Sequence, residues 1–338
     1  MEKKKEVWID NVKVIACMLV LLGHLMQSMA KNGIISEYGW YAWFNQTVYF
    51  FHVPLFFICS GYLHQKLTRI NNTGGDWGKN ILRKFLNLGV PYVTFTTAVW
   101  LVKSIFSGAG SNEMGGLFET IFLQPTAPYW YLYCLFFIFL ITGTFKTKGQ
   151  ALFGTIVALL MQVISVLGIG GGYCYAVSTV LANEIWFVLG MLLCFVDFPR
   201  KAERMSMFVG GGIVFLILSV LISEMDFEFR GMSFLMGLIA CISVVGICVV
   251  LNNRRRPNLV ITWLAKYTMP IFLMHSIFAA ALRSVLLKMG IVSAWIQIPA
   301  GIVISITGPV VAANIMKKLK YPEFFLYPSK FIKIKLEQ

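Results

Sequence analysis

The sequence contains few charged residues. Only 13% of its 338 residues are Asp, Glu, Lys or Arg, whereas 58% are hydrophobic. Soluble domains carry about 25% charged residues, so this composition excludes an ordinary soluble protein. A mean hydropathy of +0.73 points the same way. The chain is therefore predicted to be an integral membrane protein that crosses the bilayer several times.

Acidic residues are especially scarce, with 15 Asp and Glu against 29 Lys and Arg, which gives a net charge of +14. Such an excess can indicate nucleic-acid binding. Here the basic residues fall in short clusters between hydrophobic segments, as in the cytoplasmic loops of membrane proteins. We therefore expect membrane lipids, and no nucleic acid, among its partners.

Cysteine pairs with metal-binding spacing are absent. The seven cysteines are dispersed, mostly within apolar segments, and none of them forms a CxxC pair. An odd, dispersed set argues against a disulfide framework and against a zinc site. We expect no bound metal.

Hydrophobic runs close to the spanning length of about 20 residues recur along the chain. They predict an all-α, polytopic membrane helix bundle that forms one domain over residues 1–338. About ten transmembrane helices are expected, at 9–30, 47–65, 86–106, 129–145, 150–169, 182–197, 206–223, 231–251, 261–287 and 291–316.

The basic clusters predict the orientation of these helices. They lie at 3–5, 66–84, 146–148, 200–204, 254–256 and beyond 316, whereas 108–128 and 170–181 contain no Lys or Arg. Positive charge marks cytoplasmic loops, so the alternation predicts that both termini are cytoplasmic.

Three ionisable residues lie on the first predicted helix. Lys13 and His24 are eleven positions apart, which places them on similar faces and about 16 Å apart along a helix axis. Asp10 lies about one turn before Lys13. Such residues are costly in lipid and mark functional sites. Their alignment also favours retention of this segment, which otherwise imitates a cleaved signal peptide.

His24 is the main candidate for chemistry, because it is predicted to lie beyond the membrane midplane. A neutral imidazole can take a proton from a hydroxyl that attacks an activated carbonyl. It can also carry the acyl group covalently. A buried imidazole bonded to a neighbouring helix is the structural alternative. His52 is expected at a similar depth, and His275 near mid-membrane.

Two further groups of polar residues have alternative interpretations. Arg83 and Lys84, with Lys13 at the same depth, suit a phosphate-bearing cofactor, but positive-inside bias also explains their charge. Ser60 and Gly61 suit either ligand contact or close helix packing.

Several motifs together resemble the integral-membrane acyltransferase-3 superfamily, especially its branch similar to fucose 4-O-acetylase. The resemblance spans essentially the whole chain. The sequence departs from it at Asn87, where many members have a second Arg before the third helix. The motifs are Trp8-Ile-Asp-Asn-Val-Lys13, Gly23-His24, the stretch from Phe51-His52 to Ser60-Gly61-Tyr62, Arg83-Lys84 with Pro91, Tyr129-Trp130, and Pro270 to His275.

The resemblance implies an O-acyltransferase, most similar to O-acetyltransferases, in a bacterial-type plasma membrane. Such proteins move an acyl group from cytoplasmic acetyl-CoA to a hydroxyl of an extracytoplasmic or lipid-linked saccharide. It implies a catalytic role for His24, supported by Asp10, and donor binding by Lys13, Arg83 and Lys84. Acceptor or acyl-group contacts are then expected from His52, Ser60, Tyr62 and His275.

Two other classes of protein are compatible with polar residues inside the membrane. A polysaccharide exporter or other transporter also uses such residues, although the sequence has no inverted repeat and no paired broken helices. A membrane-anchoring or sensor module is the third. The acceptor glycan, the choice of acetyl over succinyl and the oligomeric state are not predicted.

Overall fold

The computed structural model describes residues 6–71, 77–106, 115–169, 174–225, 229–254 and 258–332. Within these ranges all regular secondary structure is helical, so the all-α prediction is confirmed. The same residues contain nine helical segments long and apolar enough to cross a membrane. The basic clusters at 3–5 and 255–256 lie outside the described residues.

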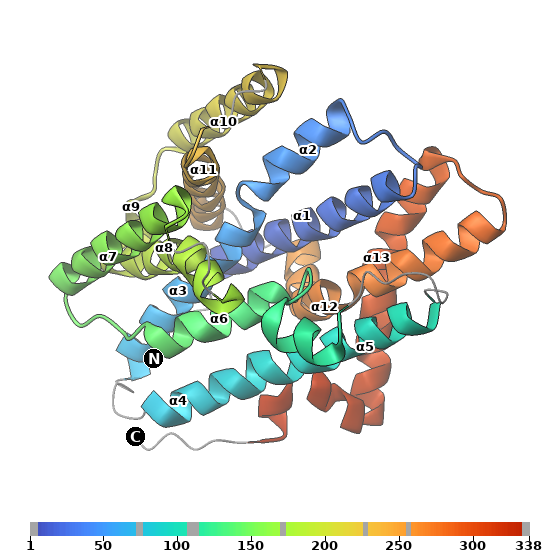
Figure 1. Cartoon of the computed structure of the whole chain (residues 1–338). Helices are drawn as coiled ribbons and strands as arrows, with labels where there is room; N and C mark the ends of the chain where they lie inside the picture. Colours follow the sequence, from blue (N-terminus) through green and yellow to red (C-terminus); the bar gives the residue numbers. More distant parts are fainter. Residues whose placement is uncertain are drawn as a thin grey trace.

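Thirteen α-helices, with short π- and 3-10 segments, make up the described part of the chain (Figure 1). The α-helices are α1 (Val7–Lys31), α2 (Trp40–Tyr49), α3 (His52–Asn71), α4 (Trp77–Lys84), α5 (Val90–Phe106), α6 (Trp130–Ile141), α7 (Lys148–Leu167), α8 (Tyr175–Phe195), α9 (Phe198–Lys201), α10 (Met205–Met225), α11 (Met232–Arg254), α12 (Leu259–Lys288) and α13 (Ala294–Leu319). The others are η1 (Phe85–Gly89), η2 (Glu119–Leu123), η3 (Tyr321–Phe325) and η4 (Pro328–Lys330).

Helix α1 is the central element of the bundle. It packs against α2, α3, α11, α12 and α13 (Figure 1). Its apolar residues are buried on several faces, with Trp8, Val12 and Leu21 almost completely inaccessible. Because α1 is one unbroken helix from Val7 to Lys31, it holds Lys13 and His24 about 16 Å apart along its axis.

Helices α3 and α8 pack with their backbones in direct contact. A Cβ atom at Gly61 would overlap the backbone carbonyl of Phe187, and one at Gly190 would overlap that of Ile58. The two glycines therefore face opposite backbones, and only a residue without a side chain fits at either position. This contact fixes the separation of two helices that also contribute to the candidate site described below.

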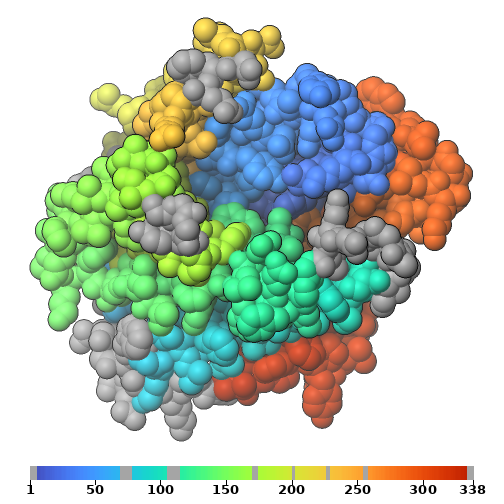
Figure 2. Space-filling view, in the orientation of Figure 1, coloured from blue at the N-terminus to red at the C-terminus, as the bar shows by residue number. Residues whose placement is uncertain are grey.

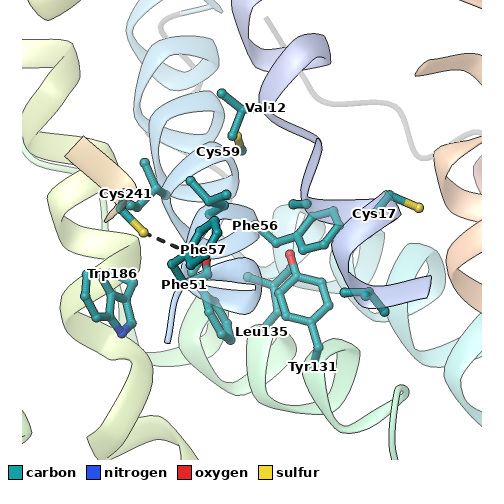
Figure 3. Close-up of a cluster of buried hydrophobic side chains, with 14 of the residues drawn as sticks. Val12, Cys17, Phe51, Phe56, Phe57, Cys59, Tyr131, Leu135, Trp186 and Cys241 are labelled. Carbon is teal, nitrogen blue, oxygen red and sulfur yellow. Dashed lines mark hydrogen bonds between the residues drawn. The ribbon is translucent and has the colours of Figure 1, made fainter. Parts of the chain in front are cut away.

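The core beside this contact is aromatic. Figure 3 shows Phe56, Phe57 and Tyr131 packed between α3 and α6, with the Phe57 and Tyr131 ring centroids 4.9 Å apart. On the other side of α3, the thiol of Cys241 donates a weak hydrogen bond to the backbone carbonyl of Phe51 at 3.8 Å. Large rings in offset and edge-on contact stabilise such a core beyond the area they bury.

The helix expected at 47–65 differs in the structure. The helix is interrupted by a turn at Phe50 and Phe51, so that α2 ends at Tyr49 and α3 begins at His52. Pro54 then lies in the first turn of α3, where a missing backbone N–H leaves no intrahelical bond unmade. Pro54 therefore accompanies the start of α3.

The helix expected at 129–145 is shorter, because α6 ends at Ile141. Its 12 residues extend about 18 Å, less than the hydrophobic thickness of a bilayer. The backbone becomes extended at Thr142. The Thr142 hydroxyl donates a hydrogen bond of 2.5 Å to the Glu184 carboxyl group. Helix α8, expected from residue 182, begins earlier, at Tyr175.

Candidate active site

Three of the four histidines come together from distant parts of the chain. His24 lies in the C-terminal half of α1, His52 at the start of α3, and His275 within α12. The ring centroids of His24 and His275 are 5.5 Å apart, at an interplanar angle of 32°. His52 lies within electrostatic range of His24. Three neighbouring imidazoles in an apolar bundle form a cluster that packing alone does not require.

Backbone carbonyls hold two of these rings in place. His52 Nδ1 lies 2.7 Å from the carbonyl oxygen of Val48, and His275 Nδ1 lies 2.9 Å from that of Ile271. A carbonyl only accepts, so Nδ1 carries the proton and Nε2 keeps its lone pair. His275 Nε2 is buried without a hydrogen-bond partner. The Nε2 lone pair of His275 therefore stays unpaired inside the bundle, with the His24 ring alongside.

A cavity of about 280 Å³ lies beside the histidines. His24 and His52 line it, together with residues of α6, α7, α8 and α11. In Figure 2, blue, green and yellow-to-gold surfaces from these parts of the chain meet around a hollow. Most of the lining is aromatic or aliphatic, which is typical of a small-molecule site.

Ser60 and Tyr62 are not among the residues that line this cavity. The Ser60 hydroxyl lies 3.2 Å from the hydroxyl of Tyr131, which is a lining residue. Tyr62 packs edge-on against Trp8, with ring centroids 4.9 Å apart. Ser60 therefore supports the cavity wall from behind, whereas Tyr62 lies with the N-terminal part of α1.

A basic cluster lies at the other end of α1. The Lys84 ammonium is 3.7 Å from the centroid of the Phe139 ring, a cation–π contact. It is also within electrostatic range of Arg83 and Lys13. Lys13 is half-buried, and the Arg83 side chain is exposed. The structure thus brings together the three cations that the sequence suggested for phosphate binding.

Asp10 belongs to this end of the molecule. It lies in the first turn of α1, where a carboxylate interacts favourably with the helix dipole. Fourteen positions separate it from His24, about 21 Å along the axis. The two side chains are therefore too distant to act on the same proton.

Most of the residues that line the cavity were not identified from the sequence as site candidates. Among them are Tyr49, Gln162, Asn183 and Trp186. Gln162 carried a usable signal, because an amide within an apolar span is costly and marks a functional position. Within the described residues, no group of three His, Cys, Asp or Glu side chains is arranged to hold a metal ion.

The fold and the site define a polytopic membrane protein with a histidine-lined cavity at one end of its central helix and a basic cluster at the other. Comparison with family models gives the particular family. The acyltransferase-3 model, described as an acyltransferase domain, matches residues 6–314. The chain belongs to this family.

Two curated relatives match part of the chain. One is the nodulation protein NolL of Mesorhizobium japonicum, 28% identical over 145 residues, or 42% of this chain and 36% of that protein. Another is the nodulation protein NolL of Sinorhizobium fredii, 26% identical over 144 residues, or 42% of this chain and 37% of that protein. The matched segment thus spans little more than a third of either relative. No solved structure matches the chain.

Proposed function

We propose that the protein transfers an acyl group, acetyl in the first instance, from cytoplasmic acyl-CoA to a hydroxyl of an extracytoplasmic or lipid-linked saccharide. Membership of the acyltransferase-3 family supports the reaction class. The observation that carries the proposal is the pairing of the Lys13, Arg83 and Lys84 cluster with the His24 cavity along one rigid helix.

The separation of the two groups suits an extended thioester donor. Lys13, Arg83 and Lys84 bind the phosphates of acyl-CoA, since guanidinium and ammonium groups favour them. The pantetheine arm then covers the roughly 16 Å along α1 to His24. This arrangement requires the N-terminal end of α1 to face the cytoplasm, as the charge pattern of the loops predicts, with ten spans and both termini inside.

His24 is the general base in this proposal. Its imidazole takes the proton of the acceptor hydroxyl while the hydroxyl oxygen bonds to the thioester carbonyl carbon. The carbon–sulfur bond breaks, the ester forms, and His24 returns the proton to the departing sulfur. Asp10 is at the donor end, where it orients Lys13. His275 lies against the His24 ring and helps to set its position.

Replacing Lys13 or Lys84 with methionine should weaken donor binding. Loss of one charge-assisted phosphate contact corresponds to an increase of about 10- to 100-fold in KM for acyl-CoA. The kcat should change little, because the base is unaffected. Lys103→Met is the matched control, since Lys103 is exposed near the end of α5. An unchanged KM in both variants would contradict the proposed donor site.

Transfer itself is tested with the purified protein, radiolabelled acetyl-CoA and a panel of acceptor glycans. Covalently acetylated saccharide is the expected product. Movement of unmodified saccharide across proteoliposomes, with no acetylation, would favour the exporter alternative.

A further inference from the structure

One wall of the cavity has no role in the transfer step described above. It comprises Trp130 of α6, Gln162 of α7, and Asn183 and Trp186 of α8, which line the same cavity as His24 and His52. An indole ring and a primary amide offer two kinds of contact, an apolar face and paired hydrogen-bonding groups.

Gln162 is the clearest sign that a ligand belongs there. Its Oε1 atom is buried without a hydrogen-bond partner, and its side chain lines the cavity. An unsatisfied buried carbonyl is costly, so a donor that enters the cavity would be bound favourably. Asn183 lies nearby, anchored by an Nδ2 hydrogen bond of 2.8 Å to the carbonyl oxygen of Thr179.

The aromatic part of the wall is rigid. Trp186 is 4% exposed, and its ring packs against Phe234, another lining residue, with centroids 5.2 Å apart. Figure 3 shows Trp186 on the far side of α3 from Phe56 and Tyr131. Trp186 thereby supports the wall, and Trp130, which is partly exposed, offers its indole to the C–H face of a pyranose ring, whose hydroxyls then point to neighbouring amides.

The absence of charged side chains from the described part of the lining indicates which class of ligand the cavity binds. None of the described residues that line the cavity is Asp, Glu, Lys or Arg. A carboxylate or phosphate buried there would lose its hydration without gaining a cationic side chain in return. An uncharged sugar ring loses only the hydrogen bonds between its hydroxyls and water, and the amides and imidazoles of the lining replace them.

We propose an acceptor subsite for an uncharged sugar ring, formed by Trp130, Trp186, Gln162 and Asn183. This subsite excludes uronic-acid and phosphorylated sugars from the acylated position. This rests on the proposed function. The Gln162 carbonyl accepts a hydrogen bond from one sugar hydroxyl and thereby turns another hydroxyl toward His24.

Binding without acyl-CoA provides the first measurement. The probes are short oligosaccharides of neutral hexoses, 6-deoxyhexoses and N-acetylhexosamines, each paired with a uronic-acid counterpart, titrated into purified protein by calorimetry. At least one neutral member should bind, and its uronic-acid counterpart should bind at least tenfold more weakly. Gln162→Leu should weaken binding of the neutral probe by about tenfold, the equivalent of one lost hydrogen bond. Asn314→Leu is the control, an amide exposed on α13 away from the cavity.

Acyl transfer to the same probes provides the second measurement. Gln162→Leu should raise KM for the acceptor by a similar factor and leave KM for acetyl-CoA unchanged. Equal binding of neutral and uronic-acid probes, an unaffected Gln162→Leu variant, or no binding of any probe would each overturn the subsite. Selective neutral binding without any acyl transfer would support the subsite and contradict the proposed function.

Discussion

Replacing His24 with glutamine should reduce acyl transfer by about 10²- to 10⁴-fold, the usual contribution of a general base. Glutamine keeps a similar size and some hydrogen-bonding capacity, but it cannot take the acceptor proton. Because His24 is remote from the basic cluster along α1, binding of acetyl-CoA should persist. Turnover of labelled acetyl-CoA and its equilibrium binding, measured on the same preparation, separate the two effects.

His64→Gln is the matched control for this variant. His64 does not line the cavity, and its ring lies 5.2 Å from that of Phe139 and 5.8 Å from that of Phe187. The same substitution there should leave kcat at saturating acetyl-CoA within a few-fold of the unmodified protein. If His24→Gln and His64→Gln retained equal activity, His24 would not be the base.

The second large effect is expected at the contact between α3 and α8. Gly61→Ala or Gly190→Ala places a methyl group against a backbone carbonyl, and overpacking of this kind costs about 1–3 kcal/mol. Larger residues such as leucine should cost more, because the backbones would have to separate. The free energy of unfolding in detergent, or the thermal midpoint, is the measurement.

Gly210→Ala provides the comparison for the glycine variants. Gly210 lies in α10, and a Cβ atom there meets no other atom within 4 Å. Its free energy of unfolding should change by no more than about 0.5 kcal/mol. Equal stability of Gly61→Ala and Gly210→Ala would show that α3 and α8 are not in backbone contact. Since α3 carries His52 and α8 carries Asn183, separation of these helices should also lower activity.

The sequence predicted the parts of the fold that depend on local pattern. The apolar run around Lys13 and His24 is long enough for one helix, so their shared face and separation follow from helical geometry alone. The break between α2 and α3 was not predicted, because the residues on both sides are equally apolar. The early end of α6 depends on Thr142, whose hydroxyl bonds to Glu184 on another helix.

The histidines were predictable as individual residues and not as a cluster. His24, His52 and His275 stand out as ionisable groups within apolar spans. That His24 and His275 lie ring to ring follows only from the packing of α1 on α12. Tyr62 shares a motif with His52, yet ten positions along a helix carry it about 15 Å away. The cavity wall combines residues from eight helices, which no local pattern specifies.

In the proposed mechanism, α1 links a cytoplasmic donor site to an acceptor site on the opposite side of the membrane. Proteoliposomes with acetyl-CoA confined to the compartment facing the Lys13 end, and acceptor saccharide confined to the other, test it directly. We expect acetylated saccharide in the acceptor compartment, and its loss with His24→Gln. Acetylation only when donor and acceptor share a compartment would contradict this mechanism.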